Sequence, residues 1–225
     1  MSRTSVALGP DRRAEGLLSR WFWFTTIGEL AGFLAPAVVG VVTASWSPWV
    51  AVPSVVAAGF IEGLVLGAAQ ATAFAAALPR LRRRRFALNT AVAAALAYVV
   101  GLGPSTWASR VGELPIWVVT ALGAVGGVVL LVSIGFAQWL ELRRLRANST
   151  WWIASTALGW LVGLVVFLLV ASPLWHEGQP TAEAVLVGLI AGAVMAISVA
   201  LVTGVAAVRL VTRSGGTKGR ARIEG

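Results

Sequence analysis

Long apolar runs with very few charged residues alternate with short polar segments along the chain, and this pattern predicts its elements. The runs cover about 21–43, 50–78, 86–103, 115–140, 151–173 and 184–210. Each has roughly the 20 residues that a helix needs to cross a hydrocarbon layer about 30 Å thick. The sequence therefore predicts an all-α integral membrane protein with six transmembrane helices. They form one domain over 21–212, between an N-terminal tail over 1–20 and a C-terminal tail over 213–225.

The six runs resemble one another in pairs. Odd-numbered runs align on a threonine followed by small residues, at Thr25, Thr90 and Thr156. Even-numbered runs align on the stretches GLVLGAAQA from Gly63, GFAQWLELRRLR from Gly135 and GLIAGAVMA from Gly188. Self-similarity at a fixed spacing is typical of membrane proteins built from repeats. We predict three parallel helical-hairpin repeats, over about 21–78, 86–140 and 151–210, which could close into a ring around a pseudo-threefold axis.

Glycines recur four residues apart in several of these runs. Small residues at this spacing let helix backbones approach closely, and in lipid that packing is a main source of helix association. We therefore expect a packing role for a set of seven glycines: Gly28, Gly63, Gly67, Gly159, Gly163, Gly188 and Gly192. We also expect the odd-numbered helices to pack on one another around a common axis through their small faces.

Composition and charge fix the class of protein and suggest its orientation. The chain is 58% hydrophobic and 12% charged, has a net charge of +9 and contains no cysteine, which excludes disulfides, thiolate metal sites and cysteine nucleophiles. With both termini in the cytoplasm, all basic residues except Arg110 lie on the cytoplasmic side, as the positive-inside rule requires. We expect a multi-pass protein of the cell (inner) membrane whose basic face meets anionic lipid headgroups, and no binding of nucleic acid.

Two carboxyl groups inside the first hairpin are the main candidates for chemistry. Glu29 and Glu62 are both predicted near the middle of the membrane, on adjacent helices. A carboxylate at that depth costs several kcal/mol unless it is protonated, paired or hydrated. With Gly32, whose carbonyl is freed by Pro36, they form a candidate proton or cation site. The alternative is a structural glutamic acid that is protonated and hydrogen-bonded to Thr25 or to the Gly32 carbonyl.

Other polar residues give weaker signals. Thr25, Gln70 and Gln138 could line a polar path, although Gln138 is also explained by a hydrogen bond to a neighbouring helix. His176 is the sole histidine, and one imidazole without a nearby second ligand makes a poor metal site. No hydrolase, phosphate-loop or dinucleotide motif occurs. We expect no metal, no cofactor and no enzymatic activity.

One stretch resembles known sequences. The segment GFAQWLELRRLR, followed by STWWIASTALGWLVG, resembles a set of uncharacterised bacterial multi-pass membrane proteins that share a Gly-x-x-Gln-Trp...Leu-Arg motif before a Trp-rich helix. The resemblance covers about 131–163 well and 63–101 less well. It implies a membrane location.

Two functions are compatible with this sequence. The first is a permease or channel-like protein that passes a proton, a cation or a small solute by way of Glu29 and Glu62. The alternative is a non-catalytic membrane scaffold or accessory subunit that binds partner helices, or further copies of itself, together with anionic lipid. A hydrated cavity that reaches both carboxyl groups would favour the first function.

Overall fold

The computed structural model describes residues 10–106 and 112–212, and these segments contain helices and no strand. The long helices are α1 (Pro10–Thr43), α2 (Pro48–Ala73), α3 (Arg83–Thr106), α5 (Ile116–Leu142), α6 (Trp151–Ala171) and α7 (Thr181–Thr212). Two short 3₁₀ turns, η1 (Phe74–Ala76) and η2 (Ser172–Leu174), follow α2 and α6. The all-α class predicted from the apolar runs is confirmed.

Six of the described helices are long and apolar enough to cross a membrane, which confirms the predicted number of spans. Their limits agree closely with the apolar runs, since the length of a run is a local property of the sequence. The main difference is at the start, where α1 begins at Pro10 and not near Trp21. Residues 1–9 and 213–225 of the expected tails, and Arg110, lie outside the described residues.

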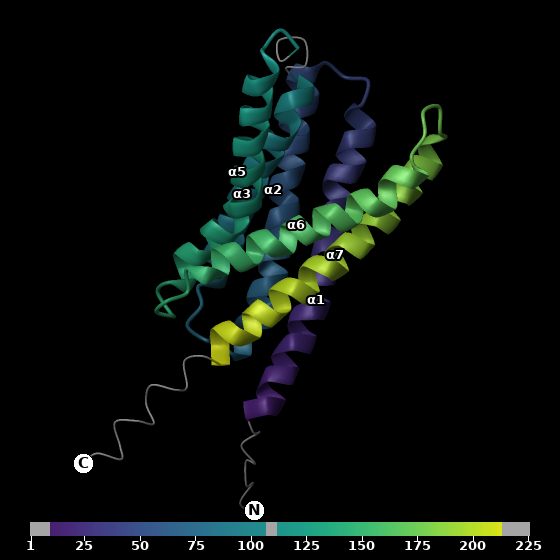
Figure 1. The fold of residues 1–225 in the computed structure, drawn as a ribbon. Helices are drawn as coiled ribbons and strands as arrows, with labels where there is room; N and C mark the ends of the chain where they lie inside the picture. The colour runs from purple at the N-terminus through teal and green to yellow at the C-terminus, as the bar shows by residue number, and fades with distance from the viewer. Residues whose placement is uncertain (1–9, 107–111, 213–225) are drawn as a thin grey trace, which may run out of the picture.

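Each helix packs on its neighbours along the chain, and α7 also packs on α1, so the order of contacts around the bundle is closed. Successive helices run in opposite directions, and the α6–α7 pair crosses the others obliquely (Figure 1). The start of α1, the end of α7 and the α2–α3 and α5–α6 turns lie at the same end. We call this the arginine end, because Arg82 and Arg144 lie in those turns.

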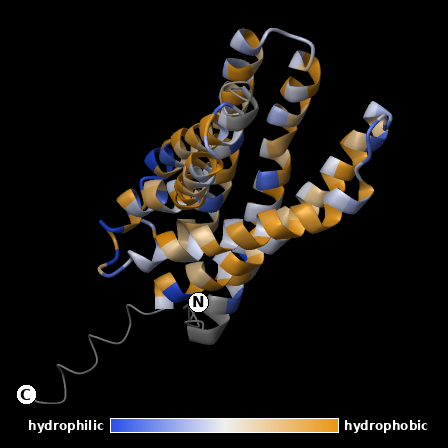
Figure 2. Ribbon diagram, turned by 45° about the horizontal axis from the view of Figure 1, so that its top comes forward, coloured by the Kyte–Doolittle hydropathy of each residue, from blue (hydrophilic) through white to orange (hydrophobic). Residues whose placement is uncertain are grey.

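Large apolar side chains are exposed on the outside of the bundle, and apolar residues predominate along the helices (Figure 2). Trp117, Ile116 and Leu169 are each more than 70% exposed. The interior has many small residues, and Ala71, Ala91 and the glycines of α2 are buried. A chain with apolar side chains outside and small ones inside suits a lipid environment, in which helices associate by close contact of their backbones.

Most of the predicted packing glycines do lie where two helices approach closely. A Cβ added at Gly28 would lie 2.5 Å from the Cβ of Ala69 on α2, and one at Gly163 would lie 2.6 Å from a methyl group of Val199 on α7. The small faces of α1 and α6 therefore contact α2 and α7. The expectation that the odd-numbered helices pack on one another through these faces is wrong, because the small faces of α1 and α3 both pack on α2 and that of α6 packs on α7.

Gly188 differs from the other glycines. A Cβ added there would meet no atom within 4 Å, whereas one at Gly192 would only touch the Phe33 ring at 3.6 Å. Where α7 contacts α1, the close approach is made by Gly204, whose added Cβ would lie 3.1 Å from the Trp21 ring. The sequence similarity that begins at Gly188 is therefore not matched by a similar contact. Gly63 and Gly67 on α2 lie in close contacts between helices, and Gly188 on α7 does not.

Candidate functional site

A cluster of aromatic rings fills the centre of the bundle at the arginine end. Trp21, Phe86 and Trp152 each lie four residues before one of the aligned threonines, and all three are fully buried. They surround Phe74, whose ring centroid is 4.6 Å from that of Trp21, 6.2 Å from that of Phe86 and 5.9 Å from that of Trp152. These rings, one each from α1, η1, α3 and α6, close the centre of the bundle at this end.

Buried hydrogen bonds join several of the polar groups beside this cluster. The Gln138 amide donates to Oε1 of Gln70 at 2.7 Å and to Oγ1 of Thr90 at 3.2 Å. The indole of Trp152 donates to Oε1 of Gln138 at 3.1 Å. These contacts join α2, α3, α5 and α6, and buried amide groups need such partners. The two glutamines therefore act as a link between helices.

This position corrects the expectation that Thr25, Gln70 and Gln138 line a polar path. All three are buried, with 0–4% of their surface exposed, and none belongs to the wall of the central cavity described below. The glutamine amides bond to each other, and Thr25 lies on the arginine-end side of Glu29. Sequence spacing alone placed them inside the bundle but could not show which space they face.

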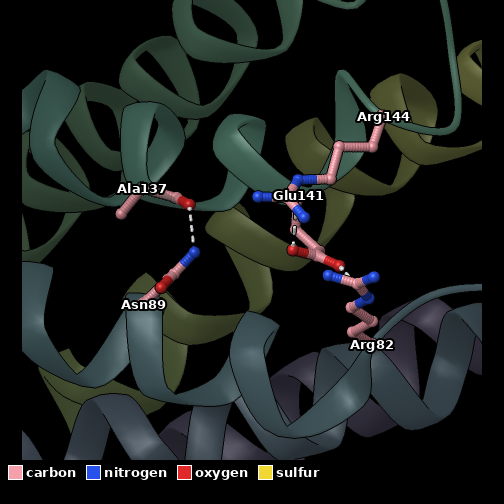
Figure 3. A network of polar contacts seen from close by, with 5 residues as sticks. All are labelled: Arg82, Asn89, Ala137, Glu141 and Arg144. Atoms are coloured by element: carbon pink, nitrogen blue, oxygen red, sulfur yellow. Dashed lines mark hydrogen bonds and ion pairs between the residues drawn. The ribbon is translucent and has the colours of Figure 1, made fainter.

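A second polar network lies nearer the arginine end, between α3 and α5 (Figure 3). The Asn89 amide donates to the carbonyl oxygen of Ala137 at 3.1 Å. The buried carboxylate of Glu141 pairs with Nε of Arg82 at 4.0 Å and with Nε of Arg144 at 3.9 Å. Both arginine side chains are half-exposed, so these pairs contribute little energy. They fix the turn of α2 to α3 against the end of α5.

A central cavity of about 330 Å³ lies farther from the arginine end. All six long helices contribute to its wall, which is formed by Glu29, Phe33, Glu62, Gly63, Leu66, Ala94, Ala97, Tyr98, Gly101, Leu102, Leu130, Ile134, Trp160, Leu164, Phe167 and Met195. Most of these side chains are apolar. The carboxyl groups and the phenol that face the cavity come from three adjacent helices, α1, α2 and α3, so one side of the cavity is polar and the other is apolar.

The two carboxyl groups predicted from the sequence meet at this polar side. Glu29 is 2% and Glu62 is 7% exposed, and the two side chains are close enough to interact. The Tyr98 hydroxyl donates to Oε2 of Glu62 at 2.7 Å. Neither oxygen of Glu29 accepts a hydrogen bond from a donor group of the described residues, and its polar neighbour is the carboxyl group of Glu62. The ion pairs that the described residues form all involve Glu141, so Glu29 and Glu62 have no cationic partner within this part of the chain.

Glycines allow the three polar groups to come together. A Cβ added at Gly32 would lie 3.1 Å from Cα and 3.2 Å from Cγ of Glu62, so Gly32 lets α2 carry Glu62 close to α1. A Cβ at Gly59 would collide with the Tyr98 ring, so Gly59 lets that ring lie flat on α2 with its hydroxyl at Glu62. Gly32 is not itself part of the cavity wall.

Sequence reasoning missed Tyr98, Gly59 and Trp160 as parts of this site. Tyr98 is the sole tyrosine of the chain, and a single phenol inside an apolar span was a usable signal, because a buried tyrosine hydroxyl usually finds a partner. No local pattern could have shown that its partner is Glu62, 36 residues earlier. Trp160 is the one tryptophan far from both ends of a predicted span, and it borders the same cavity as the carboxyl groups.

The arrangement can hold one unit of positive charge. Two neighbouring carboxylates in an apolar setting repel each other, and a shared proton or a bound cation removes that repulsion. The Tyr98 hydroxyl can orient one of the two groups. The described residues contain no group of three or more histidine or acidic side chains that could hold a metal ion.

Comparison with protein-family models, with curated proteins and with solved structures finds no match to this chain.

Proposed function

We propose that this protein is a membrane permease that carries a proton or a cation through the central cavity, with Glu29 and Glu62 as its binding groups. One observation carries the proposal: two buried carboxyl groups, which have no cationic partner among the described residues, lie together on the wall of a cavity to which all six long helices contribute. Ionisable groups at membrane depth are costly, and they usually mark the path of an ion or a proton.

The structural alternative explains these groups less well. A glutamic acid that only joined helices would make hydrogen bonds, as Gln70 and Gln138 do. Glu29 is buried and accepts from no donor group among the described residues, so that it has only the carboxyl group of Glu62 as a polar neighbour. A buried polar group without a partner costs about 1–3 kcal/mol of stability. A protein can retain such a cost where the group has to exchange a proton or a cation.

The three-hairpin repeat fits this function. In the aligned first helices of the hairpins, Glu29 corresponds to Ala94 and Trp160, and all three residues belong to the cavity wall. A carrier with one charged position and two uncharged ones around its axis binds one cation and not three. We infer that the first hairpin supplies the charge and that the other two supply the enclosing wall.

Flux through reconstituted vesicles tests the proposal. Glu29→Gln and Glu62→Gln keep the size and hydrogen-bonding capacity of each side chain but cannot release a proton or balance a cation. We expect both variants to lose proton or cation flux, measured with a dye enclosed in the vesicles, while their expression and melting temperature stay close to those of the wild type. Tyr98→Phe should reduce flux less, because it removes only one hydrogen bond from Glu62.

Glu183→Gln is the matched control, since this exposed carboxyl at the start of α7 is far from the cavity wall. It should transport like the wild type. Unchanged flux in both the Glu29 and the Glu62 variants would contradict the proposal and would favour a membrane scaffold.

A further inference from the structure

The central cavity has more apolar space than a proton or a bare metal ion needs. We infer that it binds a small organic cation, an ammonium group with apolar substituents, whose charge lies at Glu29 and Glu62 and whose body fills the rest of the cavity. This inference rests on the proposed function, because it names the class of cation that the same site would carry. At about 330 Å³ the cavity is within the size range of small-molecule sites.

The charge of the ligand follows from the polar side of the cavity. Glu29 is buried, borders the cavity and has two oxygens that accept from no donor group among the described residues. Glu62 already accepts a hydrogen bond from Tyr98. An anion would be repelled by this pair, and a neutral ligand would leave its charge uncompensated. A cation balances the pair directly.

The apolar side distinguishes an organic cation from an inorganic one. Hard metal cations need several oxygen ligands around them, and here the oxygens lie on one side only. The rest of the wall consists of apolar and aromatic groups, with the rings of Phe33, Trp160 and Phe167 among them. Aromatic rings attract organic ammonium groups through their faces. A ligand that is positive at one end and apolar over the rest matches both sides.

Binding of such a ligand should release a proton. When one monovalent ammonium ion enters, one proton leaves a carboxyl group of the pair for bulk water, so the net charge of the site does not change. No covalent bond to the ligand forms or breaks. On the other side of the membrane the step runs in reverse: a proton returns to the carboxyl pair and the organic cation leaves. The protein thereby exchanges the organic cation for a proton.

Calorimetry on the purified full-length protein tests binding, with benzyltrimethylammonium as the probe and sodium and potassium chloride as the comparison salts. We expect saturable binding of benzyltrimethylammonium, with about one proton released per bound cation in a weakly buffered solution containing a pH dye. Glu29→Gln should weaken binding roughly tenfold or more, and Glu183→Gln should not change it. Ala97→Leu, which narrows the cavity without replacing a carboxyl group, should weaken binding of the probe.

The outcomes separate this inference from the proposed function. Two results would contradict the binding of an organic cation and leave the proposed permease intact. One is proton flux that depends on the glutamates without any binding of benzyltrimethylammonium. The other is binding that Glu29→Gln and Ala97→Leu both leave unchanged. Binding that depends on both residues without any flux supports the site and overturns transport. If Glu29→Gln does not fold, proton release from the wild type and the Ala97→Leu variant still decide the question.

Discussion

Two buried indole groups at the arginine end each donate a hydrogen bond to a side chain of another hairpin. Trp21 on α1 donates to Oγ1 of Thr203 on α7 at 3.0 Å, and Trp152 on α6 donates to Gln138 on α5. The corresponding residue on α3 is Phe86, which has no donor. The oxygen of Gln70 beside it is therefore free to accept from Gln138. A single exchange of tryptophan for phenylalanine thus accounts for the Gln70–Gln138 bond.

The Gln70–Gln138 bond can be measured by a double-mutant cycle. Gln70→Met and Gln138→Met keep the side-chain volume and remove the amides, and Gln138→Met also leaves the Trp152 indole without its acceptor. We expect each variant to lower the free energy of unfolding in detergent, and the pair to be coupled by about 0.6–1.7 kcal/mol, the range found for hydrogen bonds between membrane helices. Strict additivity of the two changes would show that the amides do not bond to each other.

At the scale of the helices, the closeness of packing differs along the same bundle. α2 is sandwiched between α1 and α3, and added Cβ atoms at Gly63 and Gly67 would lie 2.5–2.9 Å from atoms of α3. The second half of α5 packs similarly on α6, where a Cβ at Gly135 would lie 2.9 Å from Cβ of Thr156. The first half of α5 has open space at Gly123 and Gly127. Rigid contacts are therefore concentrated toward the arginine end and around α2.

Substitution of two glycines tests this distribution. Gly28→Leu forces α1 and α2 apart, because even a Cβ there would lie 2.5 Å from that of Ala69. We expect it to lower the free energy of unfolding by about 1–3 kcal/mol or more. Gly188→Leu places the same side chain where nothing lies within 4 Å, and it should change stability by less than about 0.5 kcal/mol. Equal effects in thermal unfolding would show that these helices pack differently.

At the scale of the whole molecule, the two ends of the bundle have different properties. The arginine end is closed by Phe74 and the rings around it, and it carries the Arg82–Glu141–Arg144 network. The cavity lies beyond these rings. If the arginine end faces the cytoplasm, as we propose from the positive-inside rule, this conformation blocks the cavity on the cytoplasmic side and transport requires the aromatic cluster to move.

Cysteine labelling in intact cells tests that orientation, and the chain has no cysteine of its own to interfere. Ser47→Cys and Glu177→Cys lie in exposed turns at the end away from the arginines, and Ala147→Cys lies in the exposed α5–α6 turn at the arginine end. We expect an impermeant maleimide to label the first two from outside and to label Ala147→Cys only after the cells are opened. The reverse pattern would invert the proposed topology.

The sequence by itself determined the number of spans, their limits and the two carboxyl groups that lie within the first hairpin. It did so because apolar length, charge and helical rise are local quantities that need no knowledge of neighbouring helices. It also placed most of the glycines that allow close packing, since small residues four apart form a face on any helix.

Only the tertiary structure decided which groups meet. The bond from Tyr98 to Glu62, the amide pair of Gln70 and Gln138, and the open space at Gly188 each depend on how far one helix slides and rotates against another. That register is set by the fit of many side chains at once, so a match of letters, such as the one at Gly188, does not predict it. The cavity exists for the same reason, because its wall is assembled from all six helices.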